Sequence, residues 1–284
     1  MTATAHATRI RTITLVALSG AVAALIGGPV GPAAAAPKAP LSYVALGDSY
    51  ASGFGAGSYV NSCGQTPLGL PALLDKKKRI DLVADATCAG AKVVDVEGDD
   101  ADLFDQVASA GTELKTADLV TISAGGNDVG FGEVAGVCAV GSPADCANLI
   151  AFKTATAFPV LGKSLDTLYD SIESAAPDAE VVVTGYPHLF SPEFGVPVIP
   201  IESQTAFNAG TDALNALIRS QAEAHGFTFV DVVPRFEGRG LGSPSPWITF
   251  RSGAVDNLHP TAKGYKSAYF PAVRSAVTLA QLQR

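Results

Sequence analysis

The stretch SYVALGDSYASG, from Ser42 to Gly53, carries the pattern from which the architecture of this chain is predicted. Its first part, Ser42–Leu46, is an almost continuous apolar run, and the residues directly after it are typical of a turn. A short apolar run of this kind indicates a strand that is buried on both faces of a parallel sheet. The same pattern recurs four times along the chain, at Ile80–Ala86, Ala117–Ser123, Glu180–Thr184 and Phe227–Val232.

Longer stretches with helical character lie between these runs and after the last one. We expect helices at Pro67–Arg79, Leu103–Ala110, Ala147–Ala176 (with a break at Pro159), Ser203–His225 and Thr261–Leu282. Strands that alternate with helices imply a parallel sheet covered on both sides. The sequence therefore predicts an α/β fold, a three-layer α/β/α sandwich around five parallel strands. In such a sheet, functional residues gather at the carboxyl ends of the strands.

The composition narrows the possible partners of the protein. Of 284 residues, 48% are apolar and only 16% are charged, well below the ~25% that is usual for soluble domains. The formal net charge is −8, with 19 basic and 27 acidic side chains. Nucleic-acid binding draws its affinity from cationic side chains that neutralise phosphates, so we exclude this class of partner. The low share of charged residues instead suggests that the protein contacts apolar ligands or surfaces.

The amino terminus has the pattern of a secretory leader. Arg9 and Arg11 precede an uncharged run from Ile13 to Gly28, and Ala34 and Ala36 form the small-x-small pattern that signal peptidase cleaves. A membrane anchor is the alternative, but the run is shorter than the roughly 20 residues of a bilayer span. We expect residues 1–36 to be a cleaved signal peptide and residues 37–284 to form a single domain. The predicted location is extracellular, without stable membrane insertion.

The four cysteines fit an exported protein. An even number of cysteines in a secreted chain indicates disulfides, and four cysteines allow three pairings. Pairing Cys63 with Cys88 and Cys138 with Cys146 closes two short loops, so we favour it. A zinc site is the rival interpretation, but the chain has neither a C-x-x-C nor an H-E-x-x-H motif.

His259 is the best candidate for a general base among the histidines. Asp256 lies three residues before it, and one turn of chain can bring that carboxylate to Nδ1 while Nε2 faces a nucleophile. The alternative is an ordinary turn in which Asp256 caps a helix that begins at Pro260. His188 and His225 are expected to have structural roles.

Three other loop residues could complete a site with His259. Ser49 follows the first predicted strand, where its hydroxyl is exposed at the sheet edge and its N–H can face a developing oxyanion. Gly90 follows the second strand and can offer a backbone N–H. Asn127 follows the third strand and can offer a side-chain amide N–H.

These loops together resemble a known family. GDSYASG around Ser49, CAGA around Gly90, GGND around Asn127 and DNLHP around His259 are similar to the four sequence blocks of the GDSL, or SGNH, hydrolases, and they occur in the order of that family. With the leader and the cysteines, the chain looks like the secreted lipases and esterases of actinobacteria. The resemblance implies a flavodoxin-like SGNH hydrolase fold without a metal or other cofactor.

The resemblance also implies a role for each residue. Ser49 would be the nucleophile, His259 the general base and Asp256 the residue that orients His259. The N–H groups of Ser49 and Gly90 and the side chain of Asn127 would form the oxyanion hole. In some relatives a backbone carbonyl replaces the acid as the partner of the imidazole.

The substrate class follows less directly from the sequence. Three apolar segments, Phe131–Val140, Phe190–Ile201 and Leu241–Phe250, could line an acyl groove or simply pack beneath long loops. We expect a monomeric lipase or esterase that cleaves esters of lipids or fatty acids, phospholipids included. A carbohydrate acetylesterase and a non-catalytic secreted binding protein on the same fold are the alternatives.

Overall fold

The computed structural model describes residues 39–94 and 102–283. The predicted leader, residues 1–36, lies outside the described residues. None of the helices in the described ranges combines the length and the apolar character that a bilayer crossing requires.

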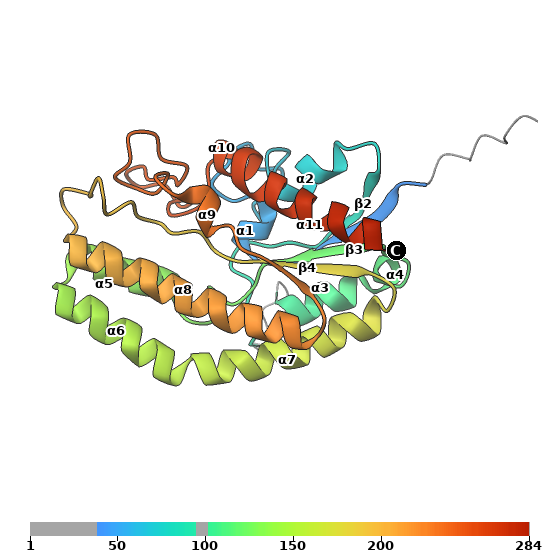
Figure 1. The fold of residues 1–284 in the computed structure, drawn as a ribbon, viewed down its shortest axis with the longest axis horizontal. Helices are drawn as coiled ribbons and strands as arrows, with labels where there is room; N and C mark the ends of the chain where they lie inside the picture. Colours follow the sequence, from blue (N-terminus) through green and yellow to red (C-terminus); the bar gives the residue numbers. More distant parts are fainter. Residues whose placement is uncertain (1–38, 95–101, 284) are drawn as a thin grey trace, which may run out of the picture. The chain divides into compact units, whose positions relative to one another are not determined.

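Five parallel strands form one sheet, which confirms the predicted architecture (Figure 1). Each strand matches one of the predicted apolar runs to within two residues at either end: β1 (Leu41–Ala45), β2 (Ile80–Asp85), β3 (Leu119–Ile122), β4 (Glu180–Thr184) and β5 (Thr228–Val230). The order across the sheet is β2-β1-β3-β4-β5, which is the flavodoxin-like doubly wound order. The direction of winding reverses at β1 and β3, and ligands of such sheets bind outside the strand ends at this switch point.

Helices cover both faces of the sheet. In Figure 1, α2 and α11 lie above the strands, whereas α3, α7 and α8 lie below them, with α5 and α6 packed against α8. The longer helices are α2 (Leu70–Asp75), α3 (Leu103–Ser109), α5 (Phe131–Val140), α6 (Pro143–Thr156), α7 (Phe158–Ala175), α8 (Ile201–Ala224) and α11 (Phe270–Gln283). The short ones are α1 (Ser49–Ser52), α4 (Gly111–Leu114), α9 (Val233–Phe236) and α10 (Ala262–Gly264).

Helix α5 corrects an expectation, because the sequence predicts no helix over Phe131–Val140. Two glycines, Gly132 and Gly136, weaken its helical pattern in the sequence. Tertiary contacts outweigh this weakness, since one face of α5 is buried and Cys138 joins the helix to α6 through a disulfide with Cys146. The second disulfide links Cys63 and Cys88, so the pairing is the one that the short loops favour.

Two predicted helices are interrupted. The helical stretch expected before Pro177 divides at Ala157, so that Pro159 falls in the first turn of α7. Proline is tolerated there because the N–H groups of the first turn have no partner within the helix. The C-terminal stretch contains a π-helical turn, Tyr265–Tyr269, directly before α11 and its Pro271.

The carboxyl ends of β1 and β3 approach each other unusually closely at Gly47. This residue has a φ of +128°, and a Cβ on it would lie 2.6 Å from the carbonyl oxygen of Ser123. The same carbonyl accepts the N–H of Asp48 at 3.0 Å. On the other side, the side-chain amide of Gln106 bonds both backbone groups of Gly47. Only glycine fits this contact, which places the turn after β1 directly against the end of β3.

We predict that Gly47→Ala lowers the free energy of unfolding by about 3 kcal/mol or more, because a methyl group would add a backbone clash to a strained φ. Gly57→Ala is the matched control. Gly57 also has a positive φ, but a Cβ there would meet nothing within 4 Å, so that variant should lose only about 1–2 kcal/mol. Urea denaturation of both variants measures the difference, and equal losses would contradict the proposed close approach.

Candidate active site

Ser49 begins the short helix α1 at the carboxyl end of β1. Asp48 caps this helix, because its carboxylate accepts the N–H of Tyr50 at 2.9 Å. The Ser49 side chain is buried, and its Oγ lies 2.8 Å from Nε2 of His259. Within the described residues, no hydrogen bond is made by the N–H of Ser49. The turn therefore presents a hydroxyl that is bonded to an imidazole, beside a free backbone donor.

His259 lies in the loop that leads into α10, and its surroundings favour the neutral ring. Tyr50 and Phe54 pack against the imidazole, with ring centroids 4.9 and 5.1 Å away. Burial lowers the pKa of His259, although the hydrogen bond to the carbonyl of Asn257 and the charge of Asp256 oppose part of this shift. A ring that is neutral near pH 7 can accept the proton of Ser49 at Nε2.

The partner of His259 Nδ1 differs from the one expected. Nδ1 lies 2.8 Å from the backbone carbonyl oxygen of Asn257, whereas the carboxylate of Asp256 is bound by Arg251, at 2.6 and 2.7 Å, and by the hydroxyl of Tyr59. The expected contact between Asp256 and the imidazole is therefore not formed. Burial opposes ionisation of Asp256, but Tyr59 and Arg251 outweigh it and hold its pKa below the usual value.

Local backbone geometry explains why the carboxylate of Asp256 bonds Arg251 and not His259. Leu258 has a positive φ of +67°, a conformation that a leucine adopts only when its surroundings enforce it. Its carbonyl accepts the hydroxyl of Tyr50 at 2.6 Å. The side chain of Asn257 is held by two hydrogen bonds to the backbone of Arg251. These bonds fix a turn in which the carbonyl of Asn257 faces the ring of His259 and Asp256 faces Arg251.

Gly90 and Asn127 lie in the two loops that adjoin the turn of Ser49. The loop after β2 is joined to this turn because the N–H of Cys88 donates to the carbonyl of Gly47 at 2.9 Å. Gly90 is exposed and has a φ of +93°, and its N–H makes no hydrogen bond within the described residues. The side-chain amide of Asn127 donates one hydrogen to the carbonyl of Ala91 at 2.8 Å, and its second hydrogen bonds no other described residue. Ser49, Gly90 and Asn127 thus each carry an N–H that no described residue accepts.

Three residues that the sequence motifs did not single out hold these loops together. The carboxylate of Asp128, directly after Asn127, accepts the N–H groups of Val93 and Val94 and so ties the loop after β2 to the loop after β3. The carboxylate of Asp48 accepts the hydroxyls of Ser123 at 2.8 Å and Tyr186 at 2.5 Å. Asp48 lies inside the GDSYASG block and Tyr186 lies two residues after the end of β4, so their position at the sheet edge was the signal that the sequence offered.

The other two described histidines each lie beside carboxylate groups. His188 lies 2.8 Å from Asp212. His225 lies at the end of α8 beside Asp166, Asp170 and Glu173. Among the described residues, His225, Asp170 and Glu173 form the one group whose ligand atoms are close enough to hold a metal ion. Because α8 leads into β5, this cluster lies toward the amino ends of the strands, opposite the edge that carries Ser49.

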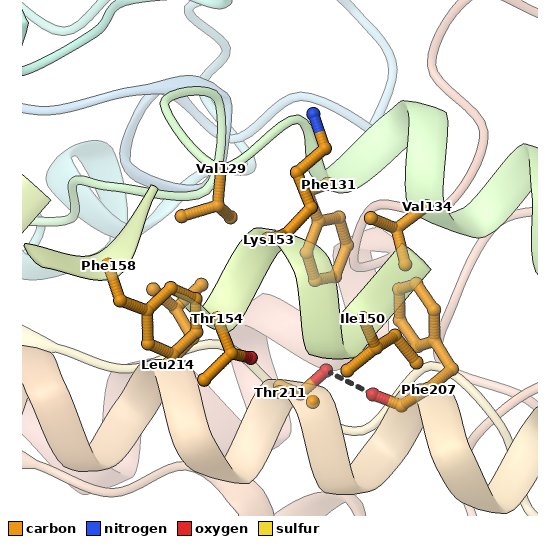
Figure 2. A pocket seen from close by; sticks show the side chains of 11 residues that line it. Val129, Phe131, Val134, Ile150, Lys153, Thr154, Phe158, Phe207, Thr211 and Leu214 are labelled. Atoms are coloured by element: carbon orange, nitrogen blue, oxygen red, sulfur yellow. Dashed lines mark hydrogen bonds between the residues drawn. The ribbon is translucent and has the colours of Figure 1, made fainter. Parts of the chain in front are cut away.

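All three apolar segments from the sequence analysis line hollows in the structure. Phe131 and Val134 of α5 face an apolar cavity between α5, α6 and α8, where they meet Ile150 and Phe207 (Figure 2). Residues 194–201 line a second, open hollow. A groove lined by residues 55–57, 241, 246, 248–251 and 261–263 lies beside His259, because a Cβ on Gly55 would lie 2.6 Å from the Cβ of His259.

Comparisons with known proteins agree with this geometry. The profile of the GDSL-like lipase/acylhydrolase family matches residues 45–267. Lipase 1 of Streptomyces coelicolor is 37% identical over 268 residues, which cover 90% of this chain and 94% of that protein. The crystal structure of the extracellular lipase from Streptomyces rimosus is similar with a TM-score of 0.73 and 38% identity, over 82% of this chain and 98% of that one. The phospholipase A1 from Streptomyces albidoflavus NA297 is similar with a TM-score of 0.73 and 33% identity, over 84% and 99%.

Asp48 generates a testable pH dependence of stability. Burial raises its pKa from 3.8 to about 6, although hydrogen bonds from Tyr186, Ser123 and Tyr50 oppose the shift. Between these pH values the folded protein keeps a proton that the unfolded chain has lost, so the stability of the wild type falls as pH rises. Above pH 6, the ionised carboxylate costs about 3 kcal/mol.

We therefore expect the unfolding free energy of Asp48→Asn, measured relative to wild type, to improve by about 2–3 kcal/mol between pH 4 and pH 7, because asparagine does not titrate. Urea denaturation at both pH values measures this change, and the contribution of His259 cancels because both proteins contain it. A difference between the two proteins that stays constant with pH would contradict the raised pKa.

Proposed function

Because the chain belongs to the GDSL-like lipase/acylhydrolase family, it is a carboxylic ester hydrolase, and we propose that it is a secreted enzyme that cleaves esters of lipids or fatty acids through an acyl-enzyme on Ser49. The observation that carries the proposal is the 2.8 Å contact between Ser49 Oγ and His259 Nε2, at the switch point of the sheet and in a turn that adjoins the loops of Gly90 and Asn127. A nucleophile, a base and an oxyanion site are the groups that acyl transfer needs.

In the first half of the proposed reaction, Ser49 attacks the ester carbonyl. His259 accepts the hydroxyl proton at Nε2 as the bond from Oγ to the carbonyl carbon forms. The negative charge on the former carbonyl oxygen is stabilised by the N–H groups of Ser49 and Gly90 and by the amide of Asn127. When the tetrahedral intermediate collapses, His259 donates its proton to the departing alcohol. Water then repeats these steps on the acyl-enzyme and releases the acid.

The partner of Nδ1 makes the proposed mechanism a dyad supported by the backbone. The carbonyl of Asn257 accepts the Nδ1–H, which fixes the tautomer that leaves Nε2 free to accept a proton. The negative charge of Asp256 is already shared with Arg251 and Tyr59. We propose that Asp256 shapes the loop of His259 and does not contact the reacting histidine.

The groove beside His259 supports an apolar substrate. Leu241, Ile248 and Phe250 lie along it, and the Phe250 side chain is 66% exposed to solvent. These apolar side chains suit an acyl or alkyl chain, and the polar residues Thr249, Arg251, Thr261 and Lys263, which also line the groove, can face the polar part of a lipid ester. Similarity to a protein described as a phospholipase A1 makes phospholipids reasonable substrates to test.

Secretion is supported by three independent features. The first is the leader pattern in residues 1–36. The second is the pair of disulfides, Cys63–Cys88 and Cys138–Cys146, which persist in oxidising compartments. The third is similarity to a lipase that is described as extracellular.

Two measurements test the proposed function. A serine-reactive phosphonate should label the folded wild type at Ser49 and leave Ser49→Ala unlabelled; no labelling of folded wild type would contradict the nucleophile and favour a binding protein. A series of p-nitrophenyl esters from acetyl to palmitoyl should show higher kcat/KM for chains beyond acetyl. Activity confined to the acetyl ester would contradict a lipid substrate and favour an acetylesterase.

A pair of variants tests the mechanism. Asn127→Ala is expected to lower kcat by about 10²–10³-fold, the usual cost of losing one oxyanion donor. Asp256→Asn should lower kcat by less than about tenfold, because a neutral amide can still bond Tyr59 and the Asn257 carbonyl remains in place. Steady-state kinetics at pH 7 on one ester measures both values, with thermal unfolding to verify that each variant is folded. A larger loss in Asp256→Asn than in Asn127→Ala would contradict the backbone-supported dyad.

A further inference from the structure

The hydroxyl of Tyr186 connects the turn of the candidate nucleophile to the loop of the candidate oxyanion donor. It donates to the carboxylate of Asp48 at 2.5 Å and accepts the backbone N–H of Gly126 at 2.9 Å. Asp48 immediately precedes Ser49, and Gly126 immediately precedes Asn127. One phenol oxygen therefore joins two loops that leave β1 and β3, at the residues next to the two reacting groups.

Tyr186 itself is held rigidly. Its backbone N–H and carbonyl both bond the side chain of Asn215 on α8, at 2.9 and 2.8 Å. Its ring packs edge-on against Tyr50 and stacks on Phe131. The side chain is 1% exposed, so its hydroxyl has few alternative partners, and the direction of its hydrogen bonds is set by the core.

The loop before Asn127 depends on this contact. A Cβ on Gly126 would lie 3.1 Å from the ring of Tyr186, so the backbone of the loop rests directly on the phenol. Without the hydroxyl, the buried N–H of Gly126 would have no acceptor, and a buried donor without a partner is costly enough to shift a loop. Such a shift would move the amide of Asn127 relative to the oxyanion, where errors of about 1 Å reduce rates by up to about 10²-fold.

We propose that Tyr186 is a positioning residue of the oxyanion site, which sets the place of Asn127 relative to Ser49 through its bonds to Asp48 and Gly126. This inference rests on the proposed function, since it assigns a task to Tyr186 only if Asn127 stabilises the oxyanion. Tyr186 does not contact the substrate, and it acts through Asn127 on the stability of the transition state. Its loss should therefore change kcat and leave KM almost unaltered.

The test compares Tyr186→Phe with wild type on one p-nitrophenyl ester. We expect kcat to fall by about tenfold or more, with KM within about twofold of wild type. Tyr43→Phe is the matched control. Tyr43 is also fully buried and bonds Thr121 at 2.6 Å through its hydroxyl, but it contacts neither Asp48 nor Gly126. It should lose stability to a similar extent and keep the kcat of wild type.

A double-mutant cycle with Asn127→Ala separates positioning from general stability. If Tyr186 acts through Asn127, then Tyr186→Phe should change kcat by less than about twofold in the Asn127→Ala background. If Tyr186→Phe is unfolded at the assay temperature, Asp48→Ala removes the acceptor at the other end of the same link and takes its place in the cycle.

Four results separate the possible failures. Wild-type kcat in folded Tyr186→Phe would overturn the inference, as would an equal loss of kcat in both backgrounds. A wild type that is inactive on all esters and unlabelled by the phosphonate would overturn the proposed function instead. An active wild type whose Asn127→Ala variant keeps full kcat would overturn the role of Asn127 and, with it, the role assigned to Tyr186.

Discussion

The buried carboxylate of Asp48 is the interaction on which the arrangement of the site depends. It caps the helix that begins at Ser49, and it accepts hydroxyl groups from the ends of β3 and β4 through Ser123 and Tyr186. Residues that follow three different strands thus meet at the side chain of Asp48. Because these strands are parallel, their carboxyl ends meet at the same edge, and a single acceptor can fix the loops that follow them.

Burial of the Asp48 carboxylate lowers the free energy of unfolding, as its raised pKa indicates. A carboxylate taken out of water favours its neutral form, and the three donors do not fully compensate for the lost hydration. Proteins retain such groups where a fixed geometry matters more than the free energy of unfolding. The same reasoning applies to Leu258, which holds a left-handed backbone conformation so that the carbonyl of Asn257 can face His259.

The loop of His259 illustrates how position along the chain can mislead. A spacing of three residues allows Asp256 to reach the imidazole, but it does not exclude other partners for the carboxylate. Arg251 and Tyr59 offer stronger bonds to a charged group than the single N–H of a neutral ring can. Both are supplied by the folded structure, one from the same loop and one from a segment almost two hundred residues earlier in the chain. The backbone carbonyl of Asn257 then fills the place beside Nδ1.

The sequence by itself determined the five strands, the parallel sheet and the four loops with Ser49, Gly90, Asn127 and His259, because apolar runs and turn residues are local properties that tertiary contacts seldom reverse. Local propensity did not predict α5, because two glycines weaken its helical pattern, although a buried face and a disulfide stabilise the helix. Only the tertiary structure decided the partner of His259 and the link from Asp48 through Tyr186 to Gly126. These are choices among competing hydrogen-bond partners, which depend on where residues distant in sequence meet in space.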